Sequence, residues 1–395
     1  MSSRPAQFFL NQLFPPVTEP ESPEVELLFL CAQASLSSQE IARLVALARQ
    51  SLAWDFFVEQ ALYHKIYPLV YHNLRTYAGS ITPPSVLDDL LPLFMKNSAA
   101  NWRTEREVQR LLQHLQEQGI KVLLLKGLVL TQMLYQTSDL REFKDIDLLV
   151  PAAQIEAART VLQELHYNAL PATETGINHE SFMDSTRNFE IELHWTIGIS
   201  YMPFDLDSED YWASATQVAL NGFSAHTLSR EDMLLMLCMH GARHRWHRLK
   251  WLVDISEFVK QSPTFDWDHA LARAEALHMK RILLLNMWLI ESLFQVTIPP
   301  VFCAHIEADK LLPFLGHYIR RWIFDQNNEG IWAQVKIATY VLLLRESWRY
   351  RLPYIISSVT HRRSREGKLF FLFLLLLLLL GGCGMLFLYK TIVLR

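Results

Sequence analysis

The chain contains 395 residues, of which 50% are hydrophobic and 20% are charged, and its formal net charge is -4. This composition is typical of a globular chain that can bury a sizeable core, and the length predicts two or three domains. It excludes an intrinsically disordered protein, and the acidic balance gives no global electrostatic reason for nonspecific nucleic-acid binding.

The N-terminal residues and the cysteines indicate the compartment. Residues 1–16 lack the basic start and the long apolar run of a signal peptide, and we expect residues 1–23 to form a flexible N-terminus. The 4 cysteines are far apart and form no CxxC spacing, so they predict neither a disulfide framework nor a zinc site. We therefore expect the bulk of the protein in the cytosol.

Residues 24–118 are predicted to form a helical N-terminal region. Apolar residues recur at helical spacing over 24–75, with Ser38 as the expected N-cap of one helix. After a proline-containing loop, residues 87–118 predict a long amphipathic helix, which Gly119 ends.

A change of period marks the start of a core that is predicted over residues 119–225. Residues 120–125 form a short, mostly apolar run with β-branched residues at its start, which indicates a strand. This strand ends at Lys126 and Gly127, and a helix is predicted from 128 to 135. The sequence thus predicts a strand, a glycine turn and a helix.

Two carboxylates stand one residue apart in the next predicted strand, which Pro151 ends before a helix over 152–165. Because successive side chains of a strand alternate between faces, Asp145 and Asp147 share one face. Like charges at that range repel each other, and at a partly buried strand end they require a counter-cation. Mg²⁺ bound through carboxylates and substrate phosphates is the usual one.

A third strand is predicted at residues 189–195, where the alternation is strict. Its apolar face consists of Phe189, Ile191, Leu193 and Trp195, and its polar face of Glu190, Glu192 and His194. The polar face could simply meet solvent. It could also bring a third carboxylate beside the first two, as a two-metal site for in-line displacement at phosphorus requires.

Residues 226–330 predict a helical C-terminal region that contains a basic cluster. Ser229 is expected to cap its first helix. His240 and His244 are four residues apart, on one helix face, but no third zinc ligand is evident nearby. The basic residues over 240–250 fit better as a rim over a triphosphate or an anionic acceptor, and a solvated helical face is the alternative.

The C-terminal part predicts a membrane anchor. Residues 369–389 carry no charge and match the ~20 apolar residues that span a bilayer, so we expect one transmembrane helix. The basic excess lies upstream, within 361–368, which places the large N-terminal part in the cytoplasm. In the juxtamembrane segment, residues 331–368, the aromatic and arginine residues of 331–359 fit either a helix at the membrane interface or a packed helix with a wet face.

Several landmarks occur in a fixed order along the chain. They are the Leu-Leu-Lys-Gly sequence at 124–127, Tyr135, Arg141, the acidic strand at 145–150, the Glu-Leu-His-Trp sequence at 192–195, and residues 54–74, 240–246 and 249–255 outside the core. On these residues, and over about residues 25–300, the chain resembles the uncharacterised bacterial nucleotidyltransferase family of the DNA polymerase β-like superfamily.

The resemblance implies an α+β fold. Its polymerase β-like nucleotidyltransferase core consists of a small mixed sheet with helices, and helical regions lie before and after this core. It implies that Asp145, Asp147 and Glu192 bind divalent metal, with two Mg²⁺ ions expected and Mn²⁺ as the alternative. The metal would bind a nucleoside triphosphate. An acceptor hydroxyl would then attack the α-phosphorus, and pyrophosphate would leave.

The resemblance also implies a nucleotide-binding set that consists of Lys126, Gly127, Arg141 and Lys250. The glycine turn would let backbone N–H groups approach the phosphates, and the basic side chains would add positive charge. The superfamily usually has Gly-Gly or Gly-Ser at this turn, whereas here Leu128 follows the glycine, so no hydroxyl is available there to hold a phosphate.

The same residues have structural interpretations. Lys126 could solvate the end of a strand, and Arg141 could pair with Glu142 or Asp139 at a surface turn. His194 is expected to be packed or hydrogen-bonded rather than to be a ligand. Glu190, on the same face as Glu192, competes for the role of third acid.

We therefore expect a nucleotidyltransferase at the inner (cytoplasmic) membrane, with a single C-terminal span and a cytoplasmic catalytic part. Its acceptor is unidentified and could be a saccharide, a lipid-linked intermediate or a protein. Nucleic acid is not expected, because the chain is acidic and has no recognisable nucleic-acid-binding module. The alternative is a catalytically silent nucleotide-binding or scaffold protein tethered to the membrane. The arrangement of Asp145, Asp147 and Glu192 discriminates between the enzyme and the silent protein, because only the enzyme requires the three carboxylates to lie within reach of one metal.

Overall fold

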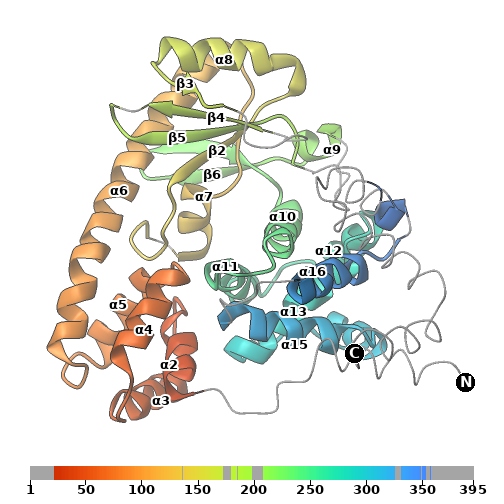
Figure 1. Ribbon diagram of the computed structural model, residues 1–395. Helices are drawn as coiled ribbons and strands as arrows, with labels where there is room; N and C mark the ends of the chain where they lie inside the picture. The colour runs from red at the N-terminus through yellow and green to blue at the C-terminus, as the bar shows by residue number, and fades with distance from the viewer. Residues whose placement is uncertain are drawn as a thin grey trace, which may run out of the picture.

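The computed structural model describes residues 22–135, 137–171, 179–184, 186–197, 208–324, 331–347, 349–352 and 356. Within these ranges, no helix is both long enough and apolar enough to cross a bilayer. The predicted transmembrane segment, residues 369–389, lies outside them, as do residues 1–21. In Figure 1 the β-sheet forms the upper part of the molecule, and helices that precede and follow it in the sequence form the lower part.

Among the described residues, four short helices and one long helix precede the sheet. They are α2 (Pro23–Cys31), α3 (Ser38–Ala48), α4 (Trp54–Tyr63), α5 (Tyr67–Tyr77) and α6 (Pro84–Glu117). The prediction of Ser38 as an N-cap is wrong by one residue, because Ser37 caps α3. The Ser37 hydroxyl accepts from the Glu40 N–H at 3.3 Å, and the Glu40 carboxylate accepts from the Ser37 N–H at 2.7 Å. This reciprocal capping box leaves Ser38 as the first helical residue.

Helix α6 links the lower helices to the sheet. It begins at Pro84 rather than at 87, because proline at the first helical position needs no partner for its missing N–H. Gly119 follows its end with a φ of 69°, a conformation that glycine adopts without strain. Figure 1 shows α6 running along one side of the molecule, from α5 to the sheet.

The sheet is mixed and has seven strands, in the order β3-β4-β5-β2-β1-β7-β6. The strands are β1 (Leu123–Leu124), β2 (Asp145–Leu149), β3 (Asn168–Ala169), β4 (His179–Asp184), β5 (Phe189–His194), β6 (Thr216–Leu220) and β7 (Phe223–Thr227). β2 pairs in parallel with β5, and β1 with β7, whereas the other pairs are antiparallel. The predicted mixed α+β fold is confirmed, but the sheet is larger than the small sheet that we expected.

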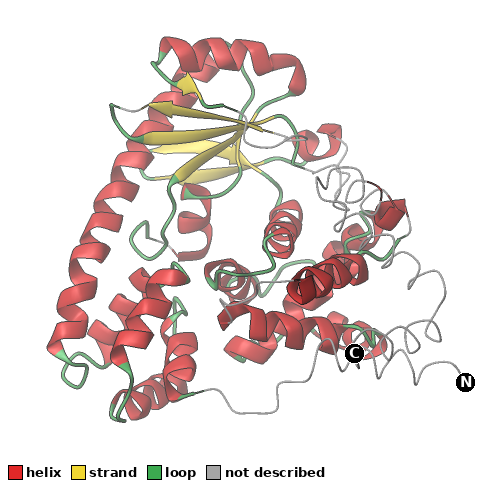
Figure 2. Cartoon of the chain, viewed as in Figure 1, coloured by secondary structure: helices red, strands yellow, loops and turns green. Residues whose placement is uncertain are grey.

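Short helical segments connect the strands. They are α7 (Leu128–Leu130), the π-helix η1 (Thr131–Tyr135), the 3₁₀-helix η2 (Ala152–Gln154), α8 (Ile155–Glu164) and α9 (Ser208–Ala213). On the sheet itself, Ile146 and Leu148 of β2 and Ile191 and Leu193 of β5 are buried, as the alternation predicts. Figures 1 and 2 show α8 on one side of the sheet and α10 and α11 on the other.

The helices after the sheet form the remaining layer. They are α10 (Arg230–Arg243), α11 (Lys250–Lys260), α12 (Trp267–Ala276), α13 (Lys280–Phe294), the 3₁₀-helix η3 (Pro300–Phe302), α14 (Cys303–Ala308), α15 (Leu312–Phe324) and α16 (Ile331–Leu344). The predicted cap at Ser229 is confirmed, because its hydroxyl accepts from the Asp232 N–H at 3.1 Å. In α16, Ala338, Tyr340 and Leu342 are buried, which favours the packed-helix interpretation over the membrane-interface interpretation for this helix.

Gly241 in α10 is required by the packing of a buried tryptophan. A Cβ at this position would lie 2.7 Å from Cδ1 of Trp246, whose fully buried indole N–H donates to Asn286 Oδ1 at 2.9 Å. Helix propensity alone would make Gly241→Ala stabilising by about 0.5–1 kcal/mol. We expect the overlap to reverse that sign and to lower the free energy of unfolding by about 1–3 kcal/mol. Urea denaturation measures this, and an unchanged or higher free energy of unfolding would contradict it.

Candidate metal and nucleotide site

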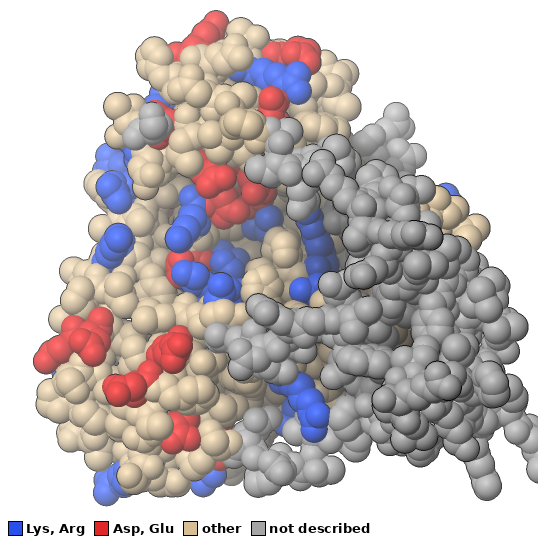
Figure 3. All heavy atoms as spheres, viewed as in Figure 1, with Lys and Arg blue, Asp and Glu red and all other residues tan. Residues whose placement is uncertain are grey.

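The two predicted acidic strands lie next to each other at the centre of the sheet. β2 and β5 run in parallel, with Asp145 opposite Glu190 and Asp147 opposite Glu192. Because the register keeps equivalent positions side by side, all four carboxylates belong to one face of the sheet. On the visible side of the molecule, Figure 3 shows acidic side chains gathered next to basic ones, between the sheet layer and the helices.

Asp147, Glu192 and His194 converge at this face. Each offers one potential ligand atom, and these atoms lie within 4.8 Å of one another. His194 Nε2 lies 3.3 Å from Asp147 Oδ1 and 3.3 Å from Glu192 Oε2. The Lys126 ammonium lies 2.7 Å from Asp147 Oδ1, and the Asp147 side chain is only 1% exposed. The three residues with Lys126 are called the acidic cluster below.

The charges of the acidic cluster compensate one another. Burial raises the pKa of the Asp147 carboxyl, but the Lys126 charge and the His194 hydrogen bond outweigh burial and lower that pKa. Burial also raises the pKa of Glu192, and the same two partners lower it to about 2. Burial lowers the pKa values of Lys126 and His194, but the neighbouring carboxylates raise both. At neutral pH both acids are therefore ionised, as ligands for a divalent cation must be.

Asp145 and Glu190, the other two carboxylates of this face, do not belong to the group of three potential metal ligands. Asp145 shares the face with Asp147 but is not a member of the three-residue group. The pKa of Glu190 is raised, by burial and then by the charges of Glu192 and Asp145. The geometry therefore favours Glu192 over Glu190 as the acid that joins Asp147.

The glycine turn brings Lys126 to the acids. The Leu125 N–H donates to Asp147 O at 3.2 Å, so the chain leaves β1 directly beside β2. Gly127 then adopts a φ of 58°, and a Cβ there would lie 3.2 Å from the Phe143 ring and 3.5 Å from Asp145 O. A side chain would thus be both strained and crowded at this position. Lys126 and Gly127, the two residues of this turn that were predicted to bind the nucleotide, therefore lie next to Asp147 and Asp145.

Arg141 is held by a buried carboxylate rather than by a partner at a surface turn. Its Nε and Nη2 donate to the two carboxylate oxygens of Asp254 in α11, each at 2.8 Å, and Tyr135 donates to the same carboxylate at 2.8 Å. The interpretation of a surface pair with Glu142 or Asp139 is wrong, because Arg141 is only 7% exposed. The residue links the segment before β2 to α11.

Lys250 lies near the acidic face without an ion pair. Burial and then the charge of Arg141 lower the pKa of its ammonium to about 8, while Asp254 and Asp145 oppose the shift. Among the described residues, no carboxylate forms a salt bridge with it. Lys250 is half-buried, and a lysine without a carboxylate partner at this face fits the predicted contact with a nucleotide.

The histidines of the predicted basic cluster pack around one tryptophan. His240, His244 and His247 have ring centroids 5.4, 5.0 and 4.8 Å from the Trp251 ring. Burial, and then the nearby cations, lower the pKa of His240 well below its usual range and that of His244 to about 4. These imidazoles are neutral at neutral pH and contribute no positive rim. In the described part of the chain, the one group of three potential metal ligands contains none of them, so zinc finds no third ligand here.

Sequence reasoning did not identify His179 as a neighbour of the site, whereas Arg243 belongs to the basic cluster that was predicted over 240–250. His179 of β4 pairs in register with His194, and the two rings are 4.9 Å apart. The charge of Arg243, at the end of α10, lowers the pKa of His179 after burial and His194. Alternation over 179–184 could have indicated β4, but its polar composition obscured the strand.

The residues present fit a divalent cation. Asp147 and Glu192 are ionised, close together and partly shielded from water, and their neighbours are the Lys126 ammonium and the His194 imidazole. Carboxylate oxygens are the ligands that hard divalent cations prefer. The acidic cluster could therefore hold such an ion, with Asp145 adjacent on the same strand.

The chain was compared with known proteins. A search of curated proteins found no match. Among solved structures, the chain is similar to the antibiotic-resistance factor ANT(2'')-Ia, with 10% identity, a TM-score of 0.34 and coverage of 45% of this chain and 91% of that chain. It is also similar to an antigenic nucleotidyltransferase-like protein from Paracoccidioides brasiliensis, with 17% identity, a TM-score of 0.33 and coverage of 53% and 97%. The model of the family described as uncharacterised nucleotidyltransferase matches residues 50–295, more than half of the chain, and the protein therefore belongs to that family.

Proposed function

We propose that the protein transfers a nucleoside monophosphate from a nucleoside triphosphate to a hydroxyl acceptor, with release of pyrophosphate, and that it requires a divalent metal. The observation that carries the proposal is the convergence of Asp147, Glu192 and His194 ligand atoms within 4.8 Å on paired parallel strands. Family membership supports nucleotidyl transfer in general.

The metal is proposed to be Mg²⁺, two ions if Asp145 also takes part, with Mn²⁺ as the alternative. Asp147 and Glu192 would hold it, and when bound it would neutralise the triphosphate and stabilise the attacking and leaving oxygens. His194 contacts both acids and fixes their carboxylates in place, as an outer partner of metal ligands does.

The chain's own cations are proposed to bind the triphosphate. Lys126 lies near Asp145 and Asp147, and Lys250 lies near Asp145, so both can attract an anion toward the acidic face. Arg243 makes no hydrogen bond or ion pair with any described residue and adds a guanidinium from the end of α10. These groups would hold the pyrophosphate moiety while the acceptor hydroxyl approaches the α-phosphorus from the opposite side.

One observation favours a second candidate function. Lys126 already supplies an ion pair to Asp147 at 2.7 Å, and a lysine can replace a metal ion as the counter-charge of an acid. In a catalytically silent nucleotide-binding or scaffold protein, this pair would persist and no transfer would occur.

Label transfer tests the proposal. Purified full-length protein is incubated with each α-labelled nucleoside triphosphate, Mg²⁺ and a lysate or membrane fraction as the source of acceptor. We expect label on a saccharide, lipid-linked or protein fraction together with pyrophosphate, and loss of both products with EDTA. Nucleotide binding without release of pyrophosphate under any of these conditions would favour the silent alternative. Transfer that is insensitive to EDTA would overturn the role of the metal.

The membrane location remains a proposal from the sequence. The apolar segment 369–389 with its upstream basic residues supports a single C-terminal anchor with the catalytic part in the cytoplasm. A lipid-linked acceptor would then be within reach. Recovery of the full-length protein in the soluble fraction after membrane sedimentation would contradict the anchor.

A further inference from the structure

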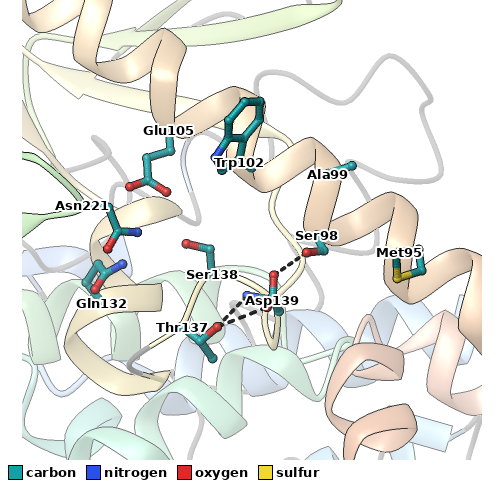
Figure 4. A pocket seen from close by; sticks show the side chains of 10 residues that line it. All are labelled: Met95, Ser98, Ala99, Trp102, Glu105, Gln132, Thr137, Ser138, Asp139 and Asn221. Carbon is teal, nitrogen blue, oxygen red and sulfur yellow. Dashed lines mark hydrogen bonds between the residues drawn. The ribbon is translucent and has the colours of Figure 1, made fainter.

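A cavity away from the acidic cluster opens between α6 and the segment that leads into β2. Its volume is about 510 Å³, within the usual range of small-molecule pockets. Trp102 and Glu105 of α6 form one wall, and Gln132 of η1, Ser138 and Asn221 face them (Figure 4). No residue of the acidic cluster lines this cavity.

The lining of the cavity is acidic. Glu105 and Asp139 contribute two carboxylates, and none of the ten lining residues is lysine, arginine or histidine. The Asp139 carboxylate accepts from the hydroxyls of Ser98 and Thr137, so its orientation is fixed by its neighbours. A cavity with this charge favours a cationic ligand and disfavours an anionic one such as a nucleotide.

Glu105 is the group that lacks a partner. The residue is only 6% exposed, and its Oε1 has no hydrogen-bond partner in the described part of the protein. Figure 4 shows the Glu105 carboxylate pointing toward the cavity, near the side chain of Asn221. The Ser138 hydroxyl, also at the wall, is buried and without a partner among the described residues. Because a buried carboxylate is costly without a hydrogen-bond donor, Glu105 favours a ligand that donates.

Trp102 provides an aromatic surface at the same wall of the cavity, three residues before Glu105 on α6. The residue lines the cavity and is 55% exposed, which is unusual for so large an apolar side chain. Its ring already attracts one cation, since the Arg106 guanidinium lies 4.2 Å from the ring centroid. A carboxylate next to an indole is the combination that recognises an organic ammonium, through a charge-assisted hydrogen bond and a cation–π contact.

We propose that this cavity binds a small primary amine in its protonated form, with the ammonium on Glu105 and the apolar body against Trp102. The site is separate from the proposed nucleotide site, so binding of the amine does not depend on nucleotidyl transfer.

Paired probes test the proposal on the full-length protein without nucleotide. Ligand-observed NMR titrations compare 2-phenylethylammonium with the neutral 2-phenylethanol. We expect the ammonium to bind about tenfold more tightly or better, because only it can form the charge-assisted contact. Glu105→Gln keeps the shape and removes the charge, so it should abolish this preference. The matched control, Glu117→Gln, makes the same change at an exposed position of α6 and should preserve the preference.

A second variant keeps the test decisive if Glu105→Gln does not fold. Trp102→Leu changes an exposed ring and should leave the fold intact while weakening ammonium binding by about two- to fivefold. Equal affinity for the ammonium and the alcohol in the unmodified protein would overturn the proposal, as would no binding of either probe at about 10 mM. Unchanged ammonium affinity in Trp102→Leu would also overturn it.

Discussion

Glu192→Gln is expected to lower the rate of nucleotidyl transfer by about a hundredfold or more, whereas Glu190→Gln should leave the rate within a few-fold. Both changes remove one negative charge from the same face of β5, two residues apart, without altering side-chain size. Only Glu192 lies opposite Asp147 and contacts His194, at 3.3 Å. The two variants therefore distinguish the loss of a metal ligand from the loss of one negative charge on this face of the sheet.

The measurement is the rate of pyrophosphate release at saturating nucleoside triphosphate, as a function of Mg²⁺ concentration. Loss of a ligand should also raise the Mg²⁺ concentration that gives half-maximal rate. Urea denaturation of both variants excludes unfolding as the cause. Equal effects of the two substitutions would contradict the choice of Glu192, and a larger effect of Glu190→Gln would reverse it.

The second large effect is expected at the buried Arg141–Asp254 pair. Arg141→Met should lower the free energy of unfolding by about 3–5 kcal/mol, because it leaves the fully buried Asp254 carboxylate without its bidentate partner. Tyr135→Phe removes one neutral donor to the same carboxylate and should cost only about 1–2 kcal/mol. Urea denaturation at neutral pH measures both changes.

A double variant provides the control for this prediction. Arg141→Met combined with Asp254→Leu removes both charges, so it should recover much of the stability that the single variant loses. If Arg141 acted chiefly on the nucleotide, Arg141→Met would instead raise the KM for the nucleoside triphosphate and leave the free energy of unfolding unchanged. That outcome would contradict the structural role derived from its contacts.

The sequence by itself determined the features that depend on neighbouring residues, namely the faces of strands and the caps of helices. The two-residue period of a strand places Asp145 with Asp147, and Glu192 with His194, whatever the rest of the chain does. The cap at Ser229 depends on residues three apart. One local signal was missed: Asn221 and Gly222 join β6 to β7, and Asn-Gly is a strong hairpin signal, with Gly222 at a φ of 86°.

The tertiary structure decided which of these residues meet. The choice between Glu190 and Glu192 depends on the register of β5 against β2, and a shift by one residue would turn the acids to the other face. Arg141 has its partner 113 positions away, and no pattern near it in the sequence could indicate Asp254. Sequence period fixes the face on which a side chain lies, because it follows from backbone geometry. Its partner depends on how distant apolar surfaces pack, and here only that packing brings Asp147, Glu192 and Lys126 together.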